Sequence, residues 1–295
     1  MGVKYIGAIM IKELTKMEGE EFIRKVLAGE RDFSNLEIAI VVDDTKSHAR
    51  WGLNKLVATI RSDSLKEMSD YLMGKNLQEE PIILDCSSIL IRANGIYLPY
   101  VKARGIYTTG SSFRNAELRY ADFSRLVGKD VISWDNDFRI GTIDSWLSHC
   151  DFKNCNLEGA DFSGSHLLEN HFIDCELRKS QFYSILTDDT KFIKSNLERA
   201  EFVGANLNNS EFNGANLKDA DFKSTDLYFT RFIGAKELAS VKGLEFAIFN
   251  TTYISPLKDR EMVKRRLLDS WDNPYKDHNE KSHFAKSKYE TEPIK

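Results

Sequence analysis

The side chains best suited to chemistry form two small groups. Asp43, Asp44 and His48 lie close together in the sequence, and they offer the groups that general acid and base catalysis requires. His166 and His171 are five residues apart, and imidazole nitrogens are common zinc ligands. Such polar residues are far more often simply solvated, and the sequence has no phosphate-binding glycine loop or nucleophile motif. We therefore expect no catalytic residue, no metal ion and no cofactor.

The elements that position these residues follow a five-residue repeat from Cys150 to Gly234. The centre of each repeat is Phe or Leu in sixteen of seventeen cases. The centres are Phe152, Leu157, Phe162, Leu167, Phe172, Leu177, Phe182, Thr187, Phe192, Leu197, Phe202, Leu207, Phe212, Leu217, Phe222, Leu227 and Phe232. A step of five residues keeps no common face on a helix and changes side in a strand. The chain must therefore turn once per repeat.

A small residue stands two positions before each centre. It is Ala, Ser, Thr or Cys in fifteen of seventeen repeats, and residues two apart in an extended segment point to the same side. A small and a large side chain therefore both point inward, and the chain winds into a solenoid with coils roughly 4.8 Å apart. Ile185 and Thr187 depart from the pattern, which predicts a local bulge. Cys150, Cys155 and Cys175 occupy small positions and are expected to be buried free thiols.

The repeats resemble those of the pentapeptide-repeat family, whose signature is Ala-Asp/Asn-Leu/Phe-x-x. Four stretches match it directly: Ala160-Asp161-Phe162, Ala205-Asn206-Leu207, Ala215-Asn216-Leu217 and Ala220-Asp221-Phe222. The resemblance implies an all-β solenoid, a right-handed quadrilateral parallel β-helix with twenty residues per coil. It also implies that the Phe and Leu centres form ladders that fill the core. Quinolone-resistance members are relatives by fold, and no close match.

The remaining sequence adds helices to this β-helix. Glu18 to Gly29 has one apolar face, and apolar residues recur at helical spacing between 46 and 74. Ile91, Ile96, Val101 and Ile106 indicate degenerate coils. The predicted segments are a cap helix and first coil (1–45), a helical insertion (46–76), degenerate coils (77–126), a loop or irregular coil (127–149), the regular β-helix with its decaying end (150–253), a C-terminal helix (254–272) and a disordered tail (273–295).

Three surface features are candidate partner sites. One side of the solenoid presents carboxylates in successive coils, and another side presents a row of isoleucines that invites either a partner or one of the chain's own helices. The segment 127–145 is either a protruding loop with exposed aromatic residues or a degenerate coil that buries them. The candidate residues are Ile173, Ile193, Ile233, Asp161, Glu201, Asp221, Trp134, Asp135 and Phe138.

Composition and charge limit the function. The chain has 295 residues, no run of eighteen apolar residues and no basic-then-apolar start, so we expect a cytoplasmic protein that does not enter a membrane. Residues 150–234 hold nine Lys and Arg against fourteen Asp and Glu, which disfavours direct binding of nucleic acid. The sequence thus predicts a non-catalytic scaffold that binds an unknown protein partner.

Two alternatives stay open. Quinolone-resistance members mimic DNA and bind type II topoisomerases such as gyrase, so the resemblance implies that this chain could do the same. Seven basic side chains interrupt its acidic field, whereas a DNA mimic should present a nearly continuous one. An enzyme housed in residues 40–110 would require a concave pocket with converging polar groups.

The C-terminal helix could also join two copies into a homodimer, as in members of the family.

Overall fold

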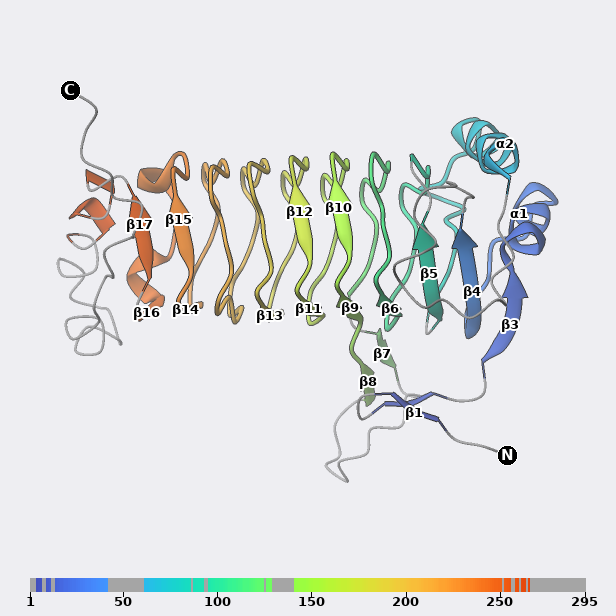
Figure 1. The fold of residues 1–295 in the computed structure, drawn as a ribbon, viewed down its shortest axis with the longest axis horizontal. Coiled ribbons are helices and arrows are strands. Elements are labelled where there is room, and N and C mark those ends of the chain that lie inside the picture. The colour runs from blue at the N-terminus through green and yellow to red at the C-terminus, as the bar shows by residue number, and fades with distance from the viewer. Residues whose placement is uncertain are drawn as a thin grey trace, which may run out of the picture.

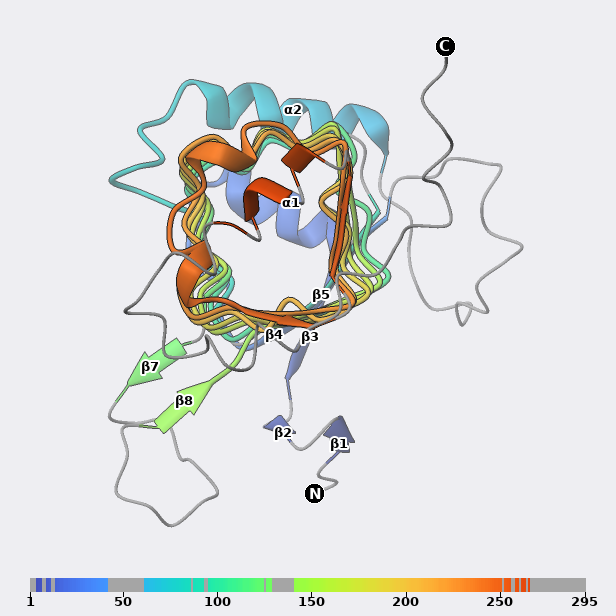
Figure 2. The same cartoon turned by 90° about the vertical axis from the view of Figure 1, so that its left-hand side faces the viewer.

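The chain forms an elongated solenoid whose coils stack along one axis (Figure 1) and enclose a nearly square interior when viewed down that axis (Figure 2). The computed structural model describes residues 4–6, 9–11, 14–41, 61–85, 87–92, 95–124, 126–128, 141–250, 252–255, 258–259, 261–263 and 265. The strands are short because the chain turns after each inward centre. We name the four sides of the coil at 145–164 side A (146–149), side B (151–154), side C (156–159) and side D (161–164), and extend these names to the residues stacked on them.

The strands pair in parallel along the solenoid, and two antiparallel pairs lie outside it. Their bounds are β1 Lys4–Ile6, β2 Ile9–Ile11, β3 Thr15–Glu18, β4 Leu36–Val41, β5 Ser88–Arg92, β6 Tyr107–Thr109, β7 Leu126–Gly128, β8 Gly141–Ile143, β9 Trp146–Ser148, β10 Asp151–Lys153, β11 His166–Leu168, β12 His171–Ile173, β13 Leu186–Asp188, β14 Asp226–Tyr228, β15 Arg231–Ile233, β16 Ile248–Asn250 and β17 Tyr253–Ser255. Side A carries a seven-stranded sheet in the order β13-β11-β9-β6-β5-β4-β3.

Phe side chains fill the core from two opposite sides. Along each side the rings stack, as Phe172 does on Phe192 with centroids 5.0 Å apart, and rings from sides B and D meet edge to face, as Phe192 and Phe202 do at 5.6 Å. All seventeen repeat centres are buried. Leu occupies sides A and C, except at Thr187, and the two kinds of residue together keep the volume of each layer nearly constant.

The predicted bulge at Ile185 and Thr187 is wrong. Leu167 pairs with Thr187 in ordinary register, and Ile185 is fully buried. The two positions have exchanged sizes, because a large residue stands at the small position and a small one at the centre. Thr187 also donates its hydroxyl hydrogen to the Asn206 carbonyl at 3.0 Å. The inward volume is conserved, so the coil keeps its path.

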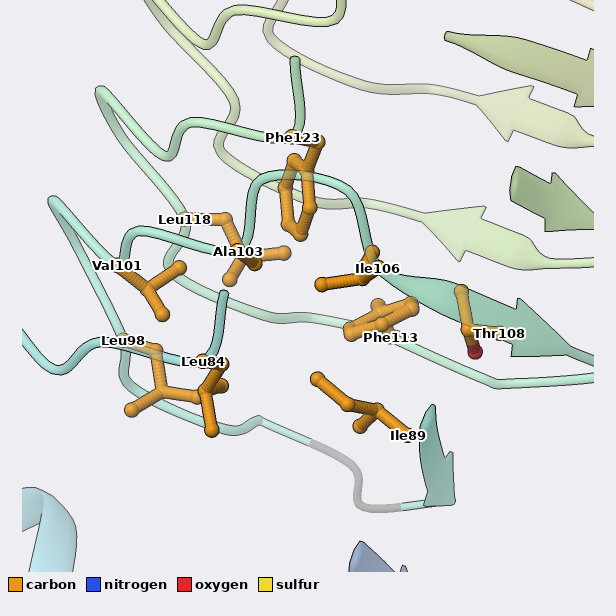
Figure 3. A pocket seen from close by; sticks show the side chains of 10 residues that line it. All are labelled: Leu84, Ile89, Leu98, Val101, Ala103, Ile106, Thr108, Phe113, Leu118 and Phe123. Carbon is orange, nitrogen blue, oxygen red and sulfur yellow. The ribbon is translucent and has the colours of Figure 1, made fainter. Parts of the chain in front are cut away.

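The register predicted for residues 91–106 is also wrong, because here too large residues stand at small positions and small residues stand at centres. Tyr97 bridges Glu117, which places Leu98 opposite the centre Leu118 and puts Ile96 at a small position. The centres that follow are Ala103 and Thr108, and Val101 and Ile106 stand before them. Beside these small centres lies an apolar cavity of about 10 Å³ (Figure 3). That volume holds at most about one water molecule, so the cavity is no ligand pocket.

A column of polar side chains links the coils at the small positions. Ser195 Oγ donates to the Phe172 carbonyl at 2.9 Å, and Cys175 Sγ donates to the Phe152 carbonyl at 2.6 Å. The Ser195 oxygen in turn accepts the Cys175 backbone N–H at 3.1 Å. Hydroxyl and thiol groups fit this position because they are small and can satisfy backbone groups where the chain turns.

Two helices lie at the N-terminal end. α1 (Gly19–Leu27) contacts β3 and β4 and buries Phe22, whose ring meets Phe33 edge to face at 4.7 Å. α2 (Ser62–Met73) contacts α1 and crosses outside the square outline in Figure 2. The N-cap residue of α2 is Arg61, whose backbone N–H donates to the Glu20 carboxylate at 2.8 Å. Residues 46–60 of the predicted helical insertion lie outside the described residues.

The segment 127–149 contains a two-stranded ribbon and part of a coil. β7 and β8 pair antiparallel from Leu126↔Ile143 to Gly128↔Gly141, and they project from the corner between sides D and A (Figure 2). Residues 146–148 belong to the regular coil as β9. Tyr107 pairs with Trp146, so this coil is 39 residues long instead of 20. The ribbon leaves the coil and rejoins it at the same corner, so the strand pairing on sides D and A continues unchanged.

The C-terminal coils are longer than predicted. Phe232 pairs with Ile254, which gives 22 residues per coil, and two 3₁₀ turns, Leu238–Ser240 and Leu244–Phe246, take up the extra residues. β17 covers residues assigned to the start of the predicted helix 254–272. Residues 258–259, 261–263 and 265 are helical, and the predicted tail at 273–295 lies outside the described residues.

Candidate interaction surface

The outward surface of the solenoid consists of side-chain rows, because each coil repeats the register of the previous one. A typical row on side C is Glu176, Asn196 and Asn216, whose side chains bond to one another at about 3.0 Å. Arg178 and Lys218 pair with Glu158 and Glu198 on the same side. Side C therefore satisfies its own polar and charged groups, which makes it a poor candidate for a partner.

The carboxylate row lies on side D. Asp161 bridges Gln181, Gln181 bridges Glu201, and Glu201 bridges Asp221. Asp161 also accepts the backbone N–H of Ser163 at 2.8 Å, and Asp221 accepts that of Lys223 at 2.9 Å. These carboxylates thus stabilise the turn after each centre, which gives Asp and Asn a structural reason to stand there.

The carboxylate row extends one coil further than predicted. Asp122 bridges Asp161 and accepts hydrogen bonds from Ser124. Partial burial raises the pKa of Asp122, and the neighbouring Asp161 charge raises it further. Like charges one coil apart therefore repel one another on this side.

The isoleucine row lies on side B. Ile173, Ile193 and Ile233 are half-buried, and Asn213 interrupts the row between the last two. The side-chain oxygen of Asn213 accepts the Ile233 backbone N–H at 3.1 Å. The described helices α1 and α2 lie at the N-terminal end, away from this row (Figure 1). Trp134, Asp135 and Phe138, the remaining predicted partner residues, lie outside the described residues, as do Asp43, Asp44 and His48.

A fourth surface, on side A, was missed by the sequence analysis. Its outward row contains Tyr107, Trp146, His166 and Leu186. The Trp146 and His166 rings stack with centroids 4.0 Å apart, and His166 Nε2 lies 3.2 Å from Asp144 Oδ2. Leu186 is 45% exposed. The signal was an apolar or aromatic residue directly before the centre, where the repeat favours Asp or Asn.

The described residues contain no catalytic constellation. No group of three His, Cys, Asp or Glu side chains among them could hold a metal ion, and His166 and His171 point from different sides. Burial raises the pKa of the Cys150 thiol to about 12 and also raises that of Cys175, so neither is a nucleophile at neutral pH. In the part of the chain that the structure describes, no helix has the length and apolarity to cross a bilayer.

The fold and these surfaces define a class: a four-sided parallel β-solenoid with a filled core and outward side-chain rows. A family model for pentapeptide repeats matches residues 147–183 and 200–236, with 8 copies. These two stretches of the solenoid therefore consist of pentapeptide repeats. This match indicates no catalytic family, and no curated protein matches the chain.

Several solved structures are similar to the chain. One is QnrB1, a plasmid-mediated fluoroquinolone resistance protein, at 16% identity, with 53% of this chain and 73% of that chain covered and a TM-score of 0.33. A pentapeptide repeat protein from the thylakoid lumen of Arabidopsis thaliana has 23% identity, coverage of 37% and 74%, and a TM-score of 0.27. HetL, involved in heterocyst differentiation regulation in the cyanobacterium Nostoc, has 17% identity, coverage of 79% and 97%, and a TM-score of 0.20.

Substitution of Cys175 by Ser tests the structural role of the buried thiols. Ser195 makes the same bond one coil later, so Cys175→Ser should change the free energy of unfolding by less than about 1 kcal/mol. Cys175→Val, which removes the donor to the Phe152 carbonyl, should cost about 1 kcal/mol more. Denaturant unfolding measures both. A Ser variant that is less stable than the Val variant would contradict this role.

Proposed function

We propose that this protein is a non-catalytic scaffold that presents a rigid surface for binding other proteins in the cytoplasm. The observation that carries the proposal is the filled core, in which every described repeat centre from 152 to 232 is buried. Every coil is also bonded to its neighbours on all four sides, for example by Phe172 N–H to the Lys191 carbonyl at 2.7 Å. Such a surface holds its side-chain rows in fixed positions, and this preorganisation lowers the entropic cost of binding.

The finer features of the fold are part of this proposal. We propose that the solenoid is right-handed, as the resemblance to the family implies. We also propose that α1 covers the N-terminal end of the core and the C-terminal helical residues cover the other, because both ends of a solenoid otherwise expose apolar groups and unpaired strand edges. The burial of Phe22 and Val263 supports these two roles.

Affinity capture of the full chain from cells that express it naturally tests the scaffold role. A matched variant replaces residues 129–140 by Asn-Gly, a two-residue turn suited to joining the paired residues Gly128 and Gly141. We expect a protein partner that co-elutes with the chain at a fixed ratio in size-exclusion chromatography. If the variant loses it, residues 129–140 contribute to the binding site. A chain that elutes without any partner would contradict the scaffold role.

The second candidate function is binding to a type II topoisomerase as a mimic of DNA. The in-register carboxylates of side D favour it, because an acidic row can replace a phosphate backbone. Lys and Arg side chains on sides B and C weaken it. Gyrase supercoiling assays with the purified chain distinguish the two functions, since a DNA mimic should inhibit or protect the enzyme at stoichiometric amounts, and an unrelated scaffold should do neither.

A further inference from the structure

Side A differs from the other three sides in its charge. In the coils from 107 to 229, its described residues are 107–110, 146–149, 166–169, 186–189, 206–209 and 226–229, and these residues include no Lys or Arg. The carboxylates of Glu169, Asp188, Asp189 and Asp226 lie on this side. Sides B, C and D all carry Lys or Arg in the corresponding coils. Apart from Glu169, whose Oε2 lies 3.2 Å from His149 Nδ1, side A therefore presents carboxylates without the Lys and Arg side chains that pair with carboxylates on side C.

Side A also concentrates exposed apolar groups. Of the four large hydrophobic residues that are well exposed among the described residues, Leu186 at 45% and Phe229 at 50% both lie on this side. Phe229 adopts a φ of 55°, a left-handed conformation that costs energy for a bulky residue. Gly or Asn would fit this corner with less strain, and the exposed Phe229 ring does not contribute to the packing of the core.

We propose that side A binds an extended segment of a protein partner that combines Lys or Arg with a large apolar side chain. The stacked rings of Trp146 and His166, together with Leu186, would receive the apolar side chain. The carboxylates of Asp188, Asp189 and Asp226 would pair with the basic groups, which are complementary in charge. This inference rests on the proposed scaffold function and names the surface and the chemistry of its partner.

The dimensions of side A fit a short segment. Trp146 and Asp226 are four coils apart, so at one strand spacing per coil they are separated by roughly 19 Å. An extended peptide rises about 3.3 Å per residue, so about six residues span this distance. Nucleic acid and anionic lipid surfaces do not fit, because the carboxylates of side A would repel their phosphates.

Selection of peptides tests the inference. Random twelve-residue peptides displayed on phage are selected on the immobilised full chain, and the enriched peptides are synthesised with a fluorescent label. We expect sequences with at least two Lys or Arg and one large apolar residue, whose affinity falls as salt increases. Absence of enrichment, or enrichment of acidic or purely apolar peptides, would overturn the proposal.

Two variants in adjacent coils locate the binding site. Leu186→Lys places a positive charge on side A at an already exposed position, and Gln181→Lys places one at the equivalent position on side D. Fluorescence anisotropy should show about tenfold weaker peptide binding for Leu186→Lys and unchanged binding for Gln181→Lys. Both variants should melt like the parent protein. Equal binding by both variants, or loss only with Gln181→Lys, would overturn the assignment to side A.

Sedimentation distinguishes a partner from a second copy of the chain. The parent protein and the Leu186→Lys variant should have the same oligomeric state in sedimentation experiments. If the parent is an oligomer that this substitution dissociates, side A is covered by another copy and the inference is wrong. A partner captured equally by the parent and Leu186→Lys would also contradict the inference while leaving the scaffold function intact, whereas absence of any partner contradicts the scaffold function itself.

Discussion

Phe192→Asp is expected to lower the free energy of unfolding by more than about 4 kcal/mol. Phe192 is fully buried, its ring stacks on Phe172 and Phe212 at 5.0 Å, and it meets Phe182 and Phe202 edge to face. The carboxylate would lie among four rings with no described basic side chain in the core to pair with. The substitution therefore buries a charge and removes the contacts of a whole ring.

The neighbouring residue supplies the control for this prediction. Ile193 is half-buried and points outward on side B, so Ile193→Asp should change the stability by less than about 1 kcal/mol. Denaturant unfolding followed by circular dichroism measures both variants. If Phe192→Asp unfolds at the same denaturant concentration as the parent, the inward orientation of the Phe ladder is wrong.

Asn170→Leu is expected to cost about 2–5 kcal/mol. Asn170 is fully buried, its Nδ2 donates to the Leu147 carbonyl at 2.7 Å, and its Oδ1 accepts the Cys150 backbone N–H at 2.8 Å. Leu has a similar size and can form neither bond. Two backbone groups that are hidden from water would thus lose these partners.

A second substitution at the same site separates hydrogen bonding from packing. Thr190 stands one coil further along the same column, and its hydroxyl donates to the Leu167 carbonyl at 2.6 Å and accepts the Asn170 N–H at 3.4 Å. Asn170→Thr should therefore recover most of the stability that Asn170→Leu loses. Thermal unfolding compares the melting temperatures of the two variants. Equal melting temperatures would show that these hydrogen bonds contribute little to stability.

The sequence predicted the regular coils because each quintet reports its own geometry. Phe and Leu at the centre and a small residue two positions earlier both face the core, so a single pattern encodes turn, side and register. The pattern failed where sizes are exchanged. Val101 and Ile106 look like centres, yet the bridge between Lys102 and Asp122 and the pairing of Tyr107 with Trp146 place them before the smaller centres Ala103 and Thr108. Volume per layer is conserved at such places, and residue type at one position alone does not reveal it.

The surface was less predictable than the core. The pattern identified the outward rows on sides B and D. It could not show that side A lacks Lys and Arg from 107 to 229, because the assignment of residues 107–110 to the side of Trp146 depends on the 39-residue coil. The longer C-terminal coils likewise depend on Glu237 and Gly243, which adopt left-handed conformations before the 3₁₀ turns. Insertions at corners change the sequence period without changing the stack.

The coils between 145 and 236 have equal length, so the number of coils fixes the axial distance between the two ends of this region. Each of them advances the chain by one strand spacing of roughly 4.8 Å, whatever its outward side chains are. The distance from the ribbon β7–β8 to the C-terminal coils is therefore fixed by how many twenty-residue units lie between them. Loss or duplication of one twenty-residue unit would change the distance between these two regions by one strand spacing, roughly 4.8 Å. A partner that contacts both regions would no longer fit both of them.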